Sequence, residues 1–441
     1  MIGLLFLALV FIPHSFPLAG AGGWNLIDLL LPFFAVFYVI KAIIQDRLYY
    51  DMRSSSILPF LFLLGTMLHI FTDPRLGGIL RSVTTYNLPV GGFRIYYDIA
   101  ICTILYYTTP LIIDNWGTLR RFLKIYVFIV FTQIIVYFSR LIFGIYTLPW
   151  DTYGSKVLKF DESSIYYGGT RYILLGKMGL YLFTYAITIL NGKRKTRIAF
   201  IILASLALIV SGGRATLFSG LFIACLFLAF RYKNWCIAVA TGLCVVLVVA
   251  IFSFSPSSLE SMPSLPRRYL SVLSPKSDIL QTGEFSRIEM WGIQLYALKR
   301  HPLWGSTNDF PRNADERALN AVMRGDTHNV YLGTASRFGL PMFMIWLLFI
   351  ARQMRRSYFV MKKSHQNAEL HSISLWLFLS LSGYLPLYIT GGGAGIGFTE
   401  TYVLFALVDI VHRLAYEQNS LIHESPRQVK IGNYITKRGV I

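Results

Sequence analysis

The sequence predicts an all-α polytopic membrane protein with about 12 transmembrane helices. Of its 441 residues, 55% are hydrophobic and only 14% are charged, and the mean hydropathy is +0.54. A soluble domain carries about 25% charged residues, and soluble domains of this size could not hide so much apolar surface in their cores. The composition therefore excludes both a set of soluble domains and an intrinsically disordered chain.

Apolar runs of about 20 residues, the length that a helix needs to cross a bilayer, recur along the whole chain. The predicted spans are residues 1–19, 26–44, 57–72, 95–113, 122–142, 172–190, 197–213, 214–230, 235–253, 328–350, 372–390 and 397–416. The first run has no Lys or Arg before it, so we expect a retained span rather than a cleaved signal peptide. No internal repeat is evident, so nothing in the sequence indicates an inverted-repeat transporter.

Lys and Arg residues fix the predicted orientation, because short cytoplasmic loops are enriched in them. If the N-terminus is cytoplasmic, the inner loops hold the dense basic clusters at 120–124, 193–197 and 352–363. We therefore expect both termini in the cytoplasm. The chain then divides into nine spans at 1–253, an outer loop at 254–327, three spans at 328–416 and a cytoplasmic tail at 417–441.

The predicted outer loop is long, polar and rich in Pro and Ser. Loops of this length without secondary structure are uncommon and are usually functional or disordered. Ile288, Trp291, Leu295 and Leu298 recur at helical spacing within it. We therefore expect one or two helices folded over the outer mouth of the bundle.

Charged residues inside the predicted spans gather at one depth. Those in the outer halves of spans or at their outer ends are Asp28, Arg94, Asp98, Arg171, Lys177, Arg214, Arg337 and Glu400. Any one of them could snorkel or pair between helices. Intramembrane charges nevertheless indicate function, and their shared depth predicts an electropositive cavity that opens outward.

Two motifs have the chemistry of an anion site. Ser211-Gly212-Gly213-Arg214-Ala215 joins two spans with almost no loop, and a small-residue turn leaves backbone N–H groups beside an arginine, which suits a phosphate. Arg287-Ile-Glu-Met-Trp291 is followed by His301-Pro302-Leu303-Trp304-Gly305, where Pro302 and Gly305 predict a turn after a short helix. Arg287 would project from the start of that helix. The plainer alternatives are a tight turn with a snorkelling arginine and simple loop packing.

The third motif, Asp326-Thr327-His328-Asn329-Val330-Tyr331, precedes Gly339-Leu340-Pro341. Asp326 or Thr327 is predicted to cap a helix whose first turn contains His328. The positive end of a helix disfavours imidazolium, so a neutral His328 could accept a proton from a hydroxyl group. The alternative is an incidental histidine at the membrane interface.

These three motifs, in this order, resemble the O-antigen ligase/polymerase family of bacterial membrane glycosyltransferases. The family pattern is a small-residue turn with Arg, an outer loop with Arg…Trp and His-Pro-x-x-Gly, and a His-Asn pair followed by Gly after nine residues. Residues 197–350 carry this pattern. Arg337 stands where the family often has an acidic residue, and Met342 where its ligases tend to have a small or hydroxyl residue.

The resemblance implies a GT-C-like fold and an inverting glycosyl transfer that needs no metal, cofactor or nucleotide sugar. Its donor would be a glycan on undecaprenyl pyrophosphate. Arg214 and Arg287 would grip the pyrophosphate leaving group, and His328 would deprotonate or orient the acceptor hydroxyl. These three are the catalytic candidates, and the candidates for substrate binding are Arg214, Arg287, His301, Asn329, Tyr331, Arg337, Lys177 and Arg171.

The preferred prediction is a polysaccharide polymerase of the bacterial inner membrane, with its active site and long, partly helical loop in the periplasm. It would move a growing O-antigen or exopolysaccharide chain onto the next lipid-linked repeat unit. A ligase would instead transfer the glycan to lipid A–core. A flippase for lipid-linked oligosaccharides fits the span count, but the long outer loop and the one-sided polar residues argue against it. Membrane lipids are expected partners and nucleic acid is not, and the sequence leaves a chain-length regulator open.

Overall fold

The computed structural model describes twelve helices, and the described part of the chain contains no β-strand. The described residues are 1–11, 26–46, 55–72, 91–143, 173–190, 194–211, 214–232, 285–306, 311, 319, 322, 329–364, 366–390 and 399–435. This all-helical architecture confirms the predicted class of a helical protein. The number of membrane crossings, the GT-C-like arrangement and the four-part division of the chain stay predictions.

Helices occupy eleven of the twelve predicted spans, and the span at 235–253 lies outside the described residues. The first eight helices are α1 (Ile2–Leu9), α2 (Leu26–Ile44), α4 (Leu58–Thr72), α6 (Gly91–Ile112), α7 (Trp116–Phe143), α9 (Ile173–Thr188), α10 (Arg194–Val210) and α11 (Arg214–Tyr232). They are followed by α16 (Phe285–Arg300), α18 (Val330–Lys363), α19 (Ala368–Thr390) and α20 (Thr399–Ile435).

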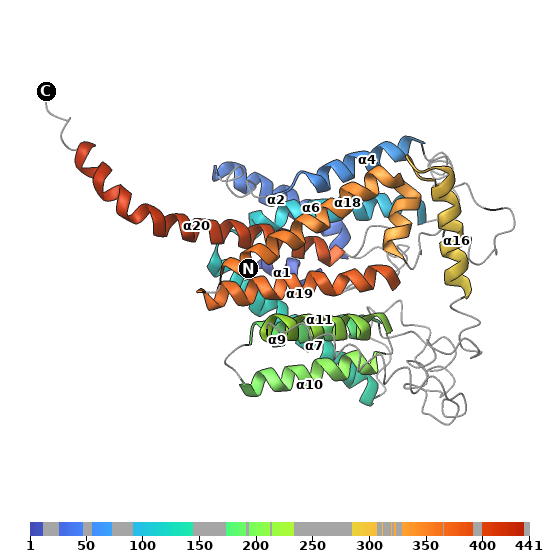
Figure 1. The fold of residues 1–441 in the computed structure, drawn as a ribbon, viewed down its shortest axis with the longest axis horizontal. Helices are drawn as coiled ribbons and strands as arrows, with labels where there is room; N and C mark the ends of the chain where they lie inside the picture. Colours follow the sequence, from blue (N-terminus) through green and yellow to red (C-terminus); the bar gives the residue numbers. More distant parts are fainter. Residues whose placement is uncertain are drawn as a thin grey trace.

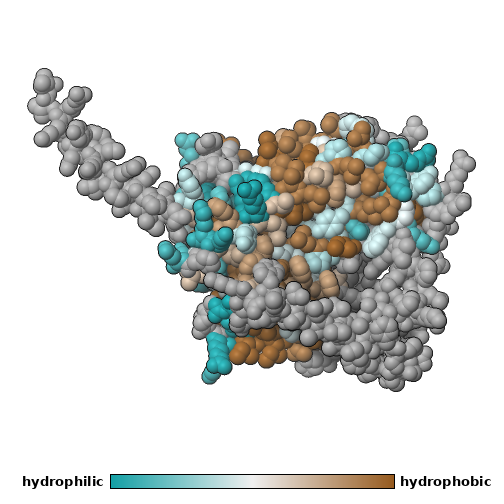
Figure 2. All heavy atoms as spheres, in the orientation of Figure 1, coloured by the Kyte–Doolittle hydropathy of each residue, from teal (hydrophilic) through white to brown (hydrophobic). Residues whose placement is uncertain are grey.

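The helices form a bundle whose surface suits a membrane. Most of them run along one direction, whereas α16 lies across one end of the bundle (Figure 1). In Figure 2, hydrophobic residues dominate the surface in the middle of the bundle and hydrophilic residues gather towards its two ends. Among the described residues, α7, α18 and α19 each contain a stretch that is long and apolar enough to cross a bilayer. These features are consistent with a helical membrane protein.

Helix α19 is central to the packing, because it contacts α9, α11, α18 and α20. Its Trp376 is fully buried and packs against the ring of Tyr126 from α7. Gly383 lets α11 approach closely, since a Cβ atom there would lie 2.5 Å from Cδ1 of Ile223. Helix α19 thus fixes the relative positions of the helices whose ends carry the sequence motifs.

The helix predicted from the spacing of Ile288, Trp291, Leu295 and Leu298 is confirmed as α16, which contacts α18 at one end of the bundle. The outer location of this segment stays a prediction. Two other helices are longer than predicted. Helix α18 continues to Lys363 rather than ending near residue 350, and α20 continues through the predicted tail to Ile435. Arginine and lysine are good helix formers, and Arg356 of the α18 extension is anchored by an ion pair to Asp409 of α20.

Candidate functional site

The Ser211–Arg214 turn lies between two packed helices. Helix α10 ends at Val210, Ser211 is buried, and α11 begins at Arg214, which confirms the predicted tight connection. The first backbone N–H groups of a helix have no partner within it and point to a region of positive potential. Arg214 is therefore at a helix start suited to an anion, although its side chain lies outside the described residues.

Helix α9 packs directly under this turn. A Cβ atom at Gly176 would lie 2.8 Å from the Ser211 hydroxyl, so the glycine allows a close approach of α9 to this residue. Lys177 is the next residue of α9. The structure therefore packs the backbone of α9, one residue before the predicted candidate Lys177, against the connection that carries Arg214.

The predicted turn after α16 is confirmed. Helix α16 ends at Arg300, the N–H group of Gly305 donates to the His301 carbonyl at 2.8 Å, and Gly305 has a φ of +68°. His301 itself is exposed. Arg287 lies in the first turn of α16, as expected, and its side chain lies outside the described residues.

This turn docks onto a break in α18. Gly339 has a φ of +80° and a ψ of 167°, which interrupts the helix. The Leu340 N–H group donates to the Pro302 carbonyl at 2.7 Å, and the Ser306 N–H group donates to the Ser336 carbonyl at 2.8 Å. Two backbones therefore meet here, so the His-Pro-x-x-Gly motif contacts the segment around the glycine that follows the His-Asn pair.

Both glycines are required by this contact. A Cβ atom at Gly305 would lie 2.7 Å from the Gly339 nitrogen, and one at Gly339 would lie 2.9 Å from the Trp304 nitrogen. Both glycines also have positive φ, which L-residues with side chains rarely adopt.

The substitution Gly339→Ala is expected to destabilise the protein by about 1–3 kcal/mol, because it adds a strained backbone and a backbone clash. Chemical unfolding of the purified protein in detergent measures this change. The matched control is Gly292→Ala in α16, where a Cβ atom has nothing within 4 Å and alanine favours the helix by about 0.5–1 kcal/mol. Equal stability of the two variants would rule out the docking contact.

The predicted cap of α18 is wrong by two or three residues. Asn329 is the N-cap, with Oδ1 accepting from the Leu332 N–H group at 2.9 Å, and the helix begins at Val330. His328 therefore precedes the cap instead of lying in the first turn, and it lies outside the described residues. Asparagine is among the best capping residues, so it takes the role given to Asp326 or Thr327.

Two other candidates are engaged in structural contacts. The half-buried Tyr331 donates its hydroxyl to the Leu385 carbonyl at 3.3 Å and packs against Tyr388. The buried Arg337 donates Nη2 to the Val322 carbonyl at 3.3 Å. Arg337 thus ties α18 to the preceding segment. Arg171 lies outside the described residues.

Lys177 forms a buried ion pair that was not predicted. Its Nζ lies 2.9 Å from Oε1 of Glu400, and both side chains are buried. The hydroxyls of Tyr181 and Tyr384 donate to the same oxygen at 2.8 and 3.2 Å and also contact each other. We call Lys177, Tyr181, Tyr384 and Glu400 the Lys177 cluster. It joins α9, α19 and α20 and neutralises the lysine.

Glu400 is predicted from the sequence as an intramembrane charge, without a partner. The spacing of Lys177 and Tyr181 is a usable signal, because residues four apart share a helix face. Tyr384 and Tyr388 have the same spacing on α19, and they link the Lys177 cluster to the start of α18. Tyr384 belongs to the Lys177 cluster, and Tyr388 packs against Tyr331, two residues after the cap of α18.

Residues 198–347 match the family model described as O-Antigen ligase. The matched segment contains Arg214, Arg287, His301 and the start of α18, and it covers less than half of the chain. A comparison of the chain with curated proteins gave no match. The resemblance to the O-antigen ligase/polymerase family is confirmed over the matched segment.

Proposed function

From the similarity of residues 198–347 to the O-antigen ligase family, we propose that this chain is a membrane glycosyltransferase that polymerises a polysaccharide. The family match supports ligase- or polymerase-type activity in general. The observation that carries the proposal is the docking of the His301–Gly305 turn onto Gly339, which joins two of the family motifs at one end of the bundle. The start of α18 lies at the same end, where α16 contacts α18 (Figure 1).

The proposed reaction transfers the glycan from undecaprenyl pyrophosphate to a hydroxyl of a lipid-linked repeat unit. The acceptor oxygen forms a bond to the anomeric carbon, and the bond from this carbon to the pyrophosphate oxygen breaks with inversion. The pyrophosphate departs with the bonding electrons, so guanidinium groups from Arg214 and Arg287 stabilise its growing charge. His328 accepts the proton of the attacking hydroxyl.

The secondary candidates take supporting roles in this proposal. His301 is exposed at the turn, where it can contact the glycan. Asn329 and Tyr331 order the start of α18 next to His328. Arg337 and Lys177 act through buried contacts, and Arg171 supplies a further positive charge near the predicted outer surface. We place the reaction on the periplasmic side of the bacterial inner membrane.

A ligase is the second candidate, because the matched family is described by that activity. It would use the same donor and the same three residues and would differ in its acceptor, which would be lipid A–core. A flippase remains the alternative from another class of protein.

The glycolipids of a deletion strain separate these three functions. The polymerase proposal expects lipid A–core that carries a single repeat unit, because ligation continues without chain growth. Polymerised glycan left on undecaprenyl pyrophosphate would support the ligase, and repeat units retained on the cytoplasmic leaflet would support the flippase. Complementation with the intact chain is the control, and either of the last two patterns contradicts the polymerase.

A further inference from the structure

A basic pocket lies between α18 and α20, towards the end of α18 that is remote from α16. It has a volume of about 300 Å³ and is lined by Arg352, Arg355, Arg356, Phe359 and His412. One water occupies about 30 Å³ in the liquid, so the pocket has room for a headgroup. In the predicted orientation it lies near the cytoplasmic surface, far from the proposed glycosyl-transfer site.

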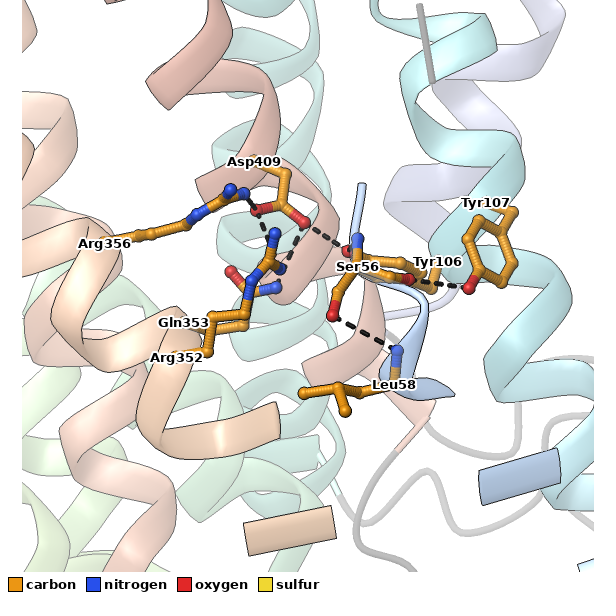
Figure 3. Close-up of polar contacts among 8 residues, drawn as sticks. All are labelled: Ser56, Leu58, Tyr106, Tyr107, Arg352, Gln353, Arg356 and Asp409. Atoms are coloured by element: carbon orange, nitrogen blue, oxygen red, sulfur yellow. Dashed lines mark hydrogen bonds and ion pairs between the residues drawn. The ribbon is translucent and has the colours of Figure 1, made fainter. Parts of the chain in front are cut away.

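One buried carboxylate supports the wall of this pocket. Asp409 has a fully buried side chain, and its Oδ1 accepts from Arg356 and lies 3.6 Å from Nη1 of Arg352 (Figure 3). Its Oδ2 accepts from Nε2 of Gln353 at 3.1 Å and from the hydroxyl of Tyr106. Both carboxylate oxygens are therefore engaged on the inner side of the arginines.

The pocket carries more positive than negative charge. Arg352 and Arg356 share the single charge of Asp409, and their side chains are still 27% and 24% exposed. Arg355 is exposed, and no carboxylate among the described residues pairs with it. Lys363 adds another base beside the pocket, with Nζ 4.3 Å from the centroid of the Phe359 ring. Such a cluster favours an anion, and the paired N–H groups of an arginine guanidinium match the geometry of two phosphate oxygens.

The surface leading to the pocket favours a ligand with an apolar tail. Met344 and Leu348 are exposed large hydrophobic residues, and they precede Arg352 and Arg355 at helical spacing on one face of α18. Phe359 continues this face beyond the arginines and is exposed too. An acyl chain can lie along the apolar face while its phosphate meets the guanidinium groups.

We propose that this pocket binds the phosphate headgroup of an anionic phospholipid of the inner leaflet. Basic pockets between transmembrane helices on the cytoplasmic side bind such headgroups in other membrane proteins. Arg352 and Arg356 are held in place by Asp409, and Arg355 supplies a charge that no carboxylate in the described part of the chain compensates. The proposal is independent of the glycosyl-transfer reaction.

Native mass spectrometry of the full-length protein tests this proposal, after delipidation and titration with dioleoylphosphatidylglycerol. Arg355→Gln is expected to weaken the apparent affinity about tenfold. Arg121→Gln is the matched control, because Arg121 is an exposed base of α7 near the same predicted surface, and it should bind as wild type does. Arg355 is outside the Asp409 network, so the thermal unfolding temperature of Arg355→Gln should stay unchanged.

Two further titrations distinguish the source of the phosphate. Dioleoylphosphatidylcholine carries the same tails without net negative charge and should bind weakly and equally to all three proteins. Inorganic phosphate should displace the anionic lipid poorly, because it lacks the tails. The proposal is overturned if Arg355→Gln binds the anionic lipid as Arg121→Gln does, or if inorganic phosphate alone binds in an Arg355-dependent manner and the lipid does not.

Discussion

Replacing Arg214 with alanine is expected to slow glycosyl transfer at least about 100-fold and to leave the amount of protein in the membrane unchanged. Removing one group that stabilises transition-state charge costs about 100- to 1,000-fold in rate. Arg287→Ala should cause a similar loss, and His328→Ala should remove the about 100- to 10,000-fold contribution of a general base. Initial rates of undecaprenyl pyrophosphate release by the reconstituted protein measure these effects.

The matched control for Arg214→Ala is Arg231→Ala. Arg231 is an exposed residue in the last turn of the same helix, α11. Its replacement removes the same charge at the opposite end of α11 and should leave the rate near that of wild type. Near-normal turnover in Arg214→Ala, Arg287→Ala or His328→Ala would remove that residue from the proposed site.

Glu400→Ala is expected to give the largest loss of stability, about 3–5 kcal/mol. The change leaves Lys177 buried without its counter-charge, and it removes the acceptor shared by Tyr181 and Tyr384. Equilibrium unfolding in mixed micelles measures the free energy of unfolding.

The double variant Lys177→Met with Glu400→Leu tests whether the loss of stability comes from leaving the buried charge of Lys177 unpaired. Replacing both members of a buried ion pair by apolar residues of similar size is often neutral, so the double variant should recover most of the stability lost in Glu400→Ala. A double variant as unstable as Glu400→Ala, or a loss below about 1 kcal/mol in Glu400→Ala, would contradict the structural role of the ion pair.

Much of the fold was predictable because a bilayer requires about 20 apolar residues per crossing. The predicted span 26–44 coincides with α2, and the predicted break between residues 213 and 214 coincides with the start of α11. The extension of α18 was not predicted, because charged residues there were interpreted as an inner loop. Its partner Asp409 is far along the chain, and a contact between such distant residues has no local sequence signal.

The candidate site was predictable only where local rules act. Pro302 and Gly305 correctly predicted the turn after α16. The docking of that turn onto Gly339 depends on two backbones that are distant in sequence, so only the structure reveals it. The partner of Lys177 was missed for the same reason. The cap of α18 was misassigned because several capping residues stand in a row and only one can take the position.

The most direct test of the proposed polymerase uses the purified wild-type chain alone in proteoliposomes. A repeat unit on undecaprenyl pyrophosphate is supplied on the outer side as both donor and acceptor. A polymerase is expected to release undecaprenyl pyrophosphate and to form lipid-linked products of two or more repeats, with inverted anomeric configuration at each new linkage. Transfer of the intact lipid-linked repeat across the bilayer, with no new glycosidic bond, would contradict it.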